Sequence, residues 1–245
     1  MRANYKLQRL FLDSPLNEGM SVSLDKAKSN YLLNVLRLQS GSELLVFNGR
    51  DGEWRARLKR DGKRAAQLVC QTLERPQTPP STLLMCFAPL KAGRLDYMIQ
   101  KSVEMGAGVL QPVLTDFTQN HRLNMDKIRA WAVEAAEQCG VLALPNCSDP
   151  VKLSALLDNW EEDRALIFCD EDHETNNPLA RLETLNAEKI GVLIGPEGGF
   201  SDEERANLRA KSYVQSIPLG PRILRADTAA VAALAIVQAK LGDWR

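Results

Sequence analysis

The chain has 245 residues, with 31 acidic and 31 basic residues and a hydrophobic fraction of 44%. These values are typical of globular proteins and exclude a fibrous or intrinsically disordered chain. No apolar run approaches the roughly 18 residues of a membrane span, and the N-terminus lacks the apolar segment of a secretory signal. We therefore expect a cytoplasmic protein without a membrane anchor. Five cysteines without a C-x-x-C pair indicate free thiols and no metal site.

The balanced total charge conceals an asymmetry along the chain. Up to Arg75 there are 14 basic and 8 acidic residues, whereas the remainder has 17 basic and 23 acidic residues. A basic module joined to an acidic one indicates that the first part binds a polyanion and that the second has another task.

A proline-rich segment, Glu74 to Ser81, separates the two parts, because three prolines in five residues cannot continue a helix or a central strand. We place the domain boundary here and expect domains of residues 1–75 and 76–245. In the first domain, hairpin-turn pairs separate short apolar stretches, and a helix from about Asp25 to Leu36 interrupts them, which predicts a small β-barrel or meander. The expected strands are Glu43–Phe47, Trp54–Leu58 and Ala65–Val69, and the turns are Asn48-Gly49, Asp51-Gly52 and Asp61-Gly62.

Strand and helix patterns alternate in the second domain. Such alternation predicts an α/β fold with a mostly parallel sheet and helices on its faces. The expected strands are Leu83–Ala88, Val109–Leu114, Ala165–Cys169, Ile190–Ile194 and about Tyr213–Ile217, and the expected helices are Leu95–Met105, Met125–Leu142, one after Ser201 and about Asp227–Leu241.

A glycine-rich turn, Gly195-Pro196-Glu197-Gly198-Gly199, follows one of the buried strands. Ser201 and Glu204 then form the pattern of a capping box, which starts the next helix. Glycine allows the backbone to approach a flat ligand closely, so the turn could present amides to an adenine or a carboxylate. A tight connection without a ligand explains the turn equally well when it is taken alone.

A second Pro/Gly loop, Leu219 to Arg225, stands between the last expected strand and the last helix, for which Asp227 is the expected N-cap. Loops at the carboxyl ends of neighbouring parallel strands line the same crevice. We therefore expect both loops to face one cavity.

These two loops resemble the ribosomal RNA small subunit methyltransferase E family of SPOUT methyltransferases. Further segments stand in the order of that family, so that the resemblance covers nearly the whole chain. They are Val35-Leu36-Arg37, Pro89-Leu90-Lys91, Gln100-Lys101 with Glu104-Met105-Gly106, and Glu134-Ala135-Ala136-Glu137-Gln138.

The resemblance implies a small PUA-like β-barrel followed by a SPOUT domain whose C-terminal part forms a trefoil knot. It also implies a homodimer that holds S-adenosylmethionine in the knot and methylates N3 of one uridine in 16S ribosomal RNA of the small ribosomal subunit. Carried over by position, the strand end Cys169 to Glu171 joins the two loops. The implied cofactor-binding residues are Ile194, Gly195, Pro196, Glu197, Gly198, Gly199, Leu219, Gly220, Ile223, Leu224 and Asp170.

Three positions depart from the family's pattern. Asp227 replaces the usual Glu, Val141 stands where an arginine is common, and Phe117 occupies a loop position that is often arginine. The departures leave the glycine loops intact, so they concern RNA contacts more than cofactor binding.

Methyl transfer to N3 requires that uridine lose its N3 proton. A positioned arginine could stabilise the uracil anion, or a carboxylate could take the proton. We favour Arg225 as the catalytic group, with Arg222 as a helper, although a salt bridge or helix-end contact is an equally good explanation of either arginine. His121 and His173 stand in polar segments and fit solvated side chains. No cysteine stands in a nucleophile context.

RNA binding is expected mainly from the basic stretch Arg50 to Arg64 of the first domain, where Trp54 could stack on a base or belong to the core. Lys101 and Glu104 are as readily explained as a surface ion pair. The candidate RNA-binding residues are Arg37, Arg55, Arg57, Arg60 and Lys91. Arg37 and Lys91 rest on the resemblance alone and are catalytic candidates as well.

Two other functions remain open. The chain could be a SPOUT enzyme that methylates another RNA base or a ribose, or it could be an RNA module that binds the cofactor without catalysis. The nucleotide that receives a labelled methyl group distinguishes these alternatives.

Overall fold

The computed structural model describes residues 6–62, 64–91, 93–170, 177–183, 185 and 187–244. The chain forms two compact units: Met1–Pro79 with Ala136–Leu144, and Pro80–Ala135 with Pro145–Arg245. The first unit therefore contains a short segment from the middle of the chain.

The first unit is built on a five-stranded sheet with the order β1-β3-β4-β5-β2, in which β1 and β3 are parallel and the other pairings are antiparallel. Leucines and valines of β2 to β5 and of the helical segment form its core. Gly49, Gly52 and Gly62 have positive φ, as the predicted turns require. Its elements are β1 (Arg9–Phe11), β2 (Ser21–Ser23), α1 (Lys26–Asn30), a π-helical turn η1 (Tyr31–Val35), β3 (Glu43–Phe47), β4 (Glu53–Asp61) and β5 (Ala65–Arg75).

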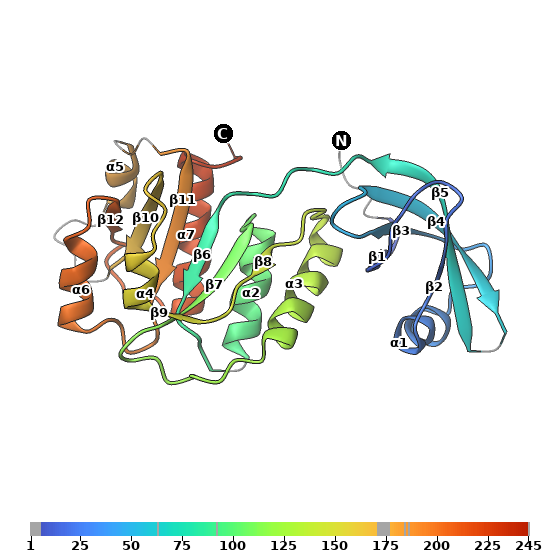
Figure 1. Ribbon diagram of the computed structural model, residues 1–245, viewed down its shortest axis with the longest axis horizontal. Coiled ribbons are helices and arrows are strands. Elements are labelled where there is room, and N and C mark those ends of the chain that lie inside the picture. The colour runs from blue at the N-terminus through green and yellow to red at the C-terminus, as the bar shows by residue number, and fades with distance from the viewer. Residues whose placement is uncertain are drawn as a thin grey trace. The chain divides into compact units, whose positions relative to one another are not determined.

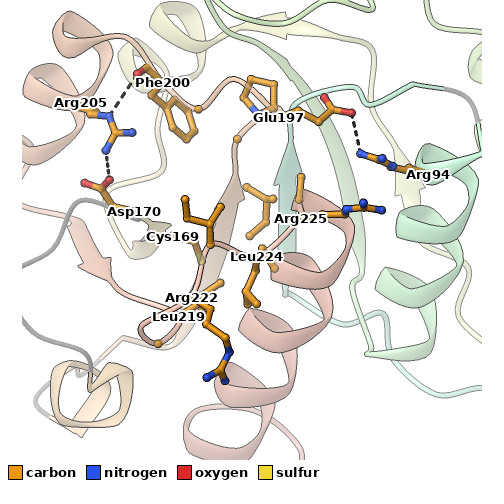
Figure 2. Close-up of a pocket in the computed structure, with 18 of the residues that line it drawn as sticks. Arg94, Cys169, Asp170, Glu197, Phe200, Arg205, Leu219, Arg222, Leu224 and Arg225 are labelled. Carbon is orange, nitrogen blue, oxygen red and sulfur yellow. Dashed lines mark hydrogen bonds and ion pairs between the residues drawn. The ribbon is translucent and has the colours of Figure 1, made fainter.

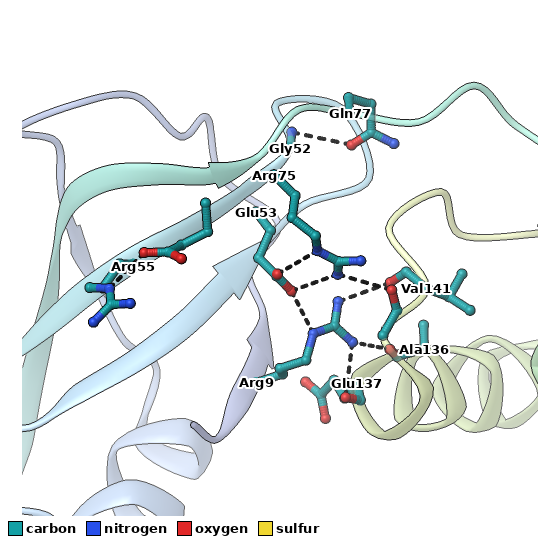
Figure 3. Close-up of polar contacts among 11 residues, drawn as sticks. Arg9, Gly52, Glu53, Arg55, Arg75, Gln77, Ala136, Glu137 and Val141 are labelled. Carbon is teal, nitrogen blue, oxygen red and sulfur yellow. Dashed lines mark hydrogen bonds and ion pairs between the residues drawn. The ribbon is translucent and has the colours of Figure 1, made fainter. Parts of the chain in front are cut away.

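A buried ionic cluster joins this sheet to the inserted segment (Figure 3). The Glu53 carboxylate pairs with Arg9 at 2.6 Å and with Arg75 at 2.7 Å, and the side chains of Arg9 and Glu53 are 4% and 1% exposed. Both arginines also donate hydrogen bonds to backbone carbonyls at the end of helix α3 (Met125–Cys139) and just beyond it. The accepting residues are Ala136, Glu137, Gly140 and Val141. The cluster thus satisfies carbonyls that a helix C-terminus leaves without partners.

The second unit has a parallel sheet with the order β12-β10-β11-β6-β7-β8, and β9 also pairs with β7 (Figure 1). Each recorded pairing in it is parallel, which confirms the predicted α/β class. Its elements are β6 (Leu84–Phe87), α2 (Arg94–Glu104), β7 (Val109–Leu114), most of α3, β8 (Asn146–Cys147), β9 (Val151–Lys152), α4 (Leu153–Asp158), β10 (Arg164–Cys169), α5 (Pro178–Glu183), β11 (Lys189–Ile194), α6 (Asp202–Arg209), β12 (Val214–Ile217) and α7 (Ala226–Lys240).

Helices cover both faces of this sheet. On one face, Phe168 of β10 and Leu193 of β11 pack with Leu157 of α4 and Leu208 of α6. On the other, α2 and α7 lie side by side, and α7 contacts β11 (Figure 1). The strands are therefore apolar on both faces, which explains their continuous hydrophobic runs.

Three predicted helices differ in detail from the structure. The helix predicted for Met125–Leu142 ends at Cys139, three residues early. The helix from Asp25 to Leu36 is instead α1, capped by Asp25 as expected, followed by the π-helical turn. The last helix begins at Ala226, and its N-cap is Arg225, two residues before the predicted Asp227; Arg225 makes no side-chain capping bond. Asp227 lies in the first turn, where its charge is favourable near the helix N-terminus.

Candidate functional site

A cavity of about 380 Å³ lies at the carboxyl ends of β10, β11 and β12. This end of a parallel sheet is where α/β proteins place their ligands. The two glycine loops both line this cavity, as predicted. Their strands, β11 and β12, were predicted to be neighbours, but β10 lies between them. The lining residues are Arg94, Cys169, Asp170, Ile194, Gly195, Pro196, Glu197, Gly199, Phe200, Arg205, Leu219, Gly220, Pro221, Arg222, Ile223, Leu224, Arg225, Ala226 and Ala229.

The first loop follows β11 and is fixed by its packing. A Cβ atom added at Gly195 would lie 2.5 Å from the ring of Phe200, which is itself buried and packs edge-on against Phe168. The predicted capping box of Ser201 and Glu204 is present and starts α6. Gly195 and Phe200 both line the cavity, and a side chain at position 195 would displace the Phe200 ring.

The second loop, Leu219 to Arg225, follows β12 and leads into α7. Gly220 has φ of +94°, a conformation that favours glycine. Ile223 is 86% exposed although it lines the cavity, so its apolar side chain is accessible to a ligand in the cavity.

The end of β10 contributes Cys169 and Asp170 between the two loops. Burial, with a contribution from the Asp170 charge, raises the pKa of the Cys169 thiol to about 12. Burial likewise raises the pKa of Cys86 to about 12. Both thiols are therefore neutral at physiological pH and unsuited to nucleophilic attack. Glu171, the last residue of the predicted strand end, lies outside the described residues.

Asp170 has a fully buried side chain that forms ion pairs with two arginines of α6. It pairs with Arg205 and, at 2.5 Å, with Arg209. The carboxylate thus binds the helix to the sheet. Its predicted role as a cofactor ligand remains a prediction.

The opposite side of the cavity carries an ion pair that the sequence did not reveal. Arg94, the first residue of α2, lies 3.7 Å from the carboxylate of Glu197 in the first loop. Figure 2 shows that Arg225 extends toward the side of this pair, whereas Arg222 extends away from it. Sequence reasoning missed Arg94 and Arg205, because neither belongs to a glycine loop; the position of Arg94 three residues after Lys91 was the available signal.

The candidate RNA-binding residues other than Lys91 belong to the first unit. Arg55 pairs with Glu43 and Glu74, and Arg57 pairs with Glu43, whereas Arg60 is exposed and makes no recorded ion pair within the described residues. Hydrogen bonds from Arg55 and Arg57 hold the pKa of the Glu43 carboxyl below its usual range. Part of the positive charge of this strand is therefore already neutralised.

Arg37 and Lys91 are both exposed. Arg37 has φ of +55°, and it is the one non-glycine residue with positive φ in the described ranges. A strained exposed arginine is a candidate contact residue, since such strain concentrates at functional positions.

Trp54 packs against the core of the first unit, and its indole nitrogen donates a hydrogen bond to the Asp51 carbonyl at 2.8 Å. The structure therefore favours the core explanation of Trp54 over base stacking.

The structure describes the surroundings of the three positions that depart from the family pattern, of which Asp227 lies in the first turn of α7. Phe117 lies beside the first loop, 3.2 Å from where a Cβ of Gly198 would stand, and the Val141 carbonyl accepts a hydrogen bond from Arg9.

Lys101 and Glu104 form an ion pair, which confirms the explanation of these residues as an ion pair on α2.

His121 lines a separate cavity of about 360 Å³ with Lys152 and Asp116, and His173 lies outside the described residues. Among residues with a described position, no cluster of three metal-ligating side chains occurs. No helix in the described part of the chain combines the length and apolar character needed to cross a membrane.

The residues around the cavity fit S-adenosylmethionine. The cavity is large enough for a nucleoside, and Gly195 and Gly199 of the first loop form part of its wall. Apolar groups such as Leu219, Ile223 and Leu224 line another wall. The fold and the site define an α/β protein that binds a nucleoside-like ligand at the carboxyl end of its sheet.

Comparison with known proteins identifies the family. Residues 77–238 match the model of the RNA methyltransferase domain, and residues 24–69 match that of the RNA methyltransferase PUA domain. The chain belongs to the ribosomal RNA small subunit methyltransferase E family. The protein of that name from Rickettsia conorii is 30% identical, with 95% of this chain and 96% of that protein covered, and the one from Synechocystis is 33% identical, with 90% and 74% covered.

Solved structures agree in fold. A Legionella pneumophila protein in complex with the bound cofactor SAM is 28% identical, with a TM-score of 0.81 and coverage of 95% of this chain and 97% of that one. A ribosomal RNA small subunit methyltransferase E from Neisseria gonorrhoeae, bound to S-adenosyl methionine, is 24% identical, with a TM-score of 0.83. The match covers 98% of this chain and 100% of that one and, at this identity, supports the fold alone.

Proposed function

We propose that this chain transfers the methyl group of S-adenosylmethionine to N3 of a uridine in 16S ribosomal RNA. The observation that carries the proposal is the convergence of both glycine loops on one cavity at the carboxyl end of the sheet, in a chain of the ribosomal RNA small subunit methyltransferase E family. The neutral thiols of Cys86 and Cys169 argue against a route through an enzyme thiol.

The two loops would hold the cofactor, which supplies an electrophilic methyl group when bound. The backbone of Gly195 to Gly199 and of Leu219 to Leu224 would orient it and exclude water from the reacting atoms. Arg225, which extends toward the Arg94 side of the cavity, would stabilise the uracil anion that forms when N3 loses its proton. Arg222 extends the other way, so a helping role for it requires a different loop position in the complex.

RNA binding and methyl transfer would belong to different domains. Residues 1–75 would bind RNA through Arg37, Arg55, Arg57 and Arg60, and residues 76–245 would carry the reaction, with Lys91 as a further RNA contact. The match of the first part to an RNA methyltransferase PUA domain supports this division. We further propose a cytoplasmic homodimer and a C-terminal trefoil knot, as in the family that the chain resembles.

The test is a transfer assay with labelled S-adenosylmethionine and small ribosomal subunits that lack the modification. We expect one labelled nucleoside, methylated at N3 of uridine, after digestion of the 16S ribosomal RNA. Label on another base or on a ribose would contradict the target, and binding of the cofactor without transfer would contradict the activity.

A further inference from the structure

Methylation of uridine at N3 needs a group that accepts the N3 proton, and the following inference rests on the proposed function. Carboxylates are the suitable acceptors in this cavity, because both thiols of the neighbouring strands are neutral and His121 lies in a different cavity. Among the described lining residues, the carboxylates are Asp170 and Glu197.

Asp170 is unsuited to take up a proton. Its side chain is fully buried and forms ion pairs with Arg205 and Arg209. Protonation would leave two guanidinium groups without their counterion, at a cost typical of a broken buried ion pair. Asp170 therefore acts as a structural anion between β10 and α6.

Glu197 has the opposite character. Its side chain is 33% exposed, and its contact with Arg94 is 3.7 Å long, well beyond a charge-assisted hydrogen bond of about 2.8 Å. The carboxylate therefore keeps the capacity to accept a further hydrogen bond. It belongs to the rigid first loop, which fixes its backbone beside the proposed cofactor position.

The cationic groups around Glu197 suit a reaction that moves negative charge. Arg94 contacts the carboxylate directly, and Arg225 extends toward the same side of the cavity (Figure 2). When a proton passes from a uracil ring to the carboxylate, the negative charge passes from the carboxylate to the ring. Guanidinium groups beside the carboxylate would stabilise the negative charge before and after the transfer.

We propose that Glu197 is the catalytic proton acceptor for uridine N3 and that Arg94 positions its carboxylate. The N3–H bond breaks and its proton passes to a carboxylate oxygen of Glu197. The N3 electron pair forms the new bond to the methyl carbon, and the methyl–sulfur bond breaks with its electron pair remaining on sulfur. The protonated Glu197 returns its proton to solvent after the product leaves.

The experiment compares Glu197→Gln with wild type in single-turnover methylation of small subunits assembled from transcribed 16S ribosomal RNA. We expect the rate to fall about a hundredfold, the lower end of what general-base catalysis contributes. Calorimetry with S-adenosylhomocysteine should give a dissociation constant within about threefold of wild type, because the amide keeps the size and polarity of the side chain.

A second substrate separates proton transfer from a structural defect. Subunits whose RNA contains 5-fluorouridine offer a more acidic N3 proton, since fluorine withdraws electrons from the ring. The reduction of the methylation rate by Glu197→Gln should be at least tenfold smaller on this substrate than on ordinary RNA. On ordinary RNA, the rate of the variant should keep rising at pH values where the wild-type rate has become constant. A loss that is equal on both substrates would overturn the inference, as would a loss matched by weaker cofactor binding.

Three further variants test whether the effect is specific to Glu197 and whether Arg94 positions its carboxylate. Glu203→Gln changes an exposed carboxylate of α6 outside the cavity and should retain the wild-type rate. Arg94→Ala should lower the rate at unchanged affinity for S-adenosylhomocysteine, and Arg94→Lys should restore most of it. Wild type that labels no N3 position would contradict the proposed function itself, whereas N3 labelling that is unaffected by Glu197→Gln would contradict only this inference.

Discussion

Gly195 and Gly220 serve the cavity for different physical reasons. At Gly195 the φ angle is ordinary and space is the constraint, because an added Cβ would lie 2.5 Å from the Phe200 ring. At Gly220 no atom lies within 4 Å of an added Cβ, and the constraint is the φ angle of +94°. One glycine is needed for close packing, and the other for the direction in which the chain turns toward α7.

The two loop arginines, Arg225 and Arg222, should differ in their effect on catalysis. We expect Arg225→Ala to lower the methylation rate about a hundredfold at saturating cofactor, as loss of one anion-stabilising donor does in other enzymes. Arg222→Ala should lower it less than about tenfold, because its side chain extends away from the Arg94 side of the cavity.

Rates measured at saturating S-adenosylmethionine, together with its dissociation constant, check this prediction. Equal effects of the two variants would contradict it, and so would full activity of Arg225→Ala with unchanged cofactor affinity.

At the scale of single elements, strand β4 carries arginines of two kinds. Arg55 is held between Glu43 and Glu74, whereas Arg60 near the end of the strand is exposed. A cation that is already paired gains less from meeting a phosphate, because its acidic partners must be displaced. The structure therefore ranks Arg60 above Arg55 as an RNA contact, an order that the sequence could not provide.

This ranking predicts the salt dependence of RNA binding. Arg60→Ala should reduce the slope of the logarithm of the RNA binding constant against the logarithm of salt concentration by about one, as removal of one phosphate contact does. Arg55→Ala should change the slope less. Binding titrations with 16S ribosomal RNA at several salt concentrations measure both slopes, and a larger change in Arg55→Ala would reverse the ranking.

The Arg9–Glu53–Arg75 cluster holds the segment after α3 in the first unit. Glu53 is buried, which by itself raises its pKa, but hydrogen bonds from Arg75 and Arg9 outweigh burial and hold the pKa of Glu53 below its usual value of 4.5. The folded state therefore binds this proton less readily than the unfolded state. The resulting stabilisation is complete above pH 4.5 and is lost as the pH falls through the lowered pKa.

We expect Glu53→Gln to lower the free energy of unfolding at pH 7 by about 3–5 kcal/mol, because it leaves two arginines without their buried counterion. Between pH 7 and pH 3 the free energy of unfolding should also fall less in this variant than in wild type, because position 53 no longer has a carboxyl group that takes up a proton. Urea unfolding at pH 7 and in steps toward pH 3 measures both effects. Glu43→Gln, which removes a more exposed carboxylate, is the control and should have a much smaller effect.

At the scale of the whole molecule, the sequence predicted the parts that depend on local patterns. The parallel sheet and the capping box at Ser201 follow from apolar runs and turn residues close together in the chain. The convergence of the glycine loops was predicted on the premise that their strands are neighbours, and both loops line one cavity although β10 lies between those strands. The pairing of Arg94 with Glu197 joins residues about a hundred positions apart, and no local pattern encodes it. The membership of residues 136–144 in the first unit is equally non-local, since α3 has one continuous helical pattern across both units.

The place of β10 between β11 and β12 was also beyond sequence reasoning. Strand order in a parallel sheet depends on which crossovers pack best, and the apolar runs of the three strands do not distinguish them. This order brings Cys169 and Asp170 between the loops and thereby completes the cavity.

The central claim is that the two loops form a binding site for a sulfonium nucleoside. Isothermal titration calorimetry of the wild-type protein with S-adenosylmethionine and with S-adenosylhomocysteine tests it most directly. We predict saturable heat with one site per chain for both compounds. The absence of any heat of association for either compound, at protein concentrations where the chain is folded, would contradict the account.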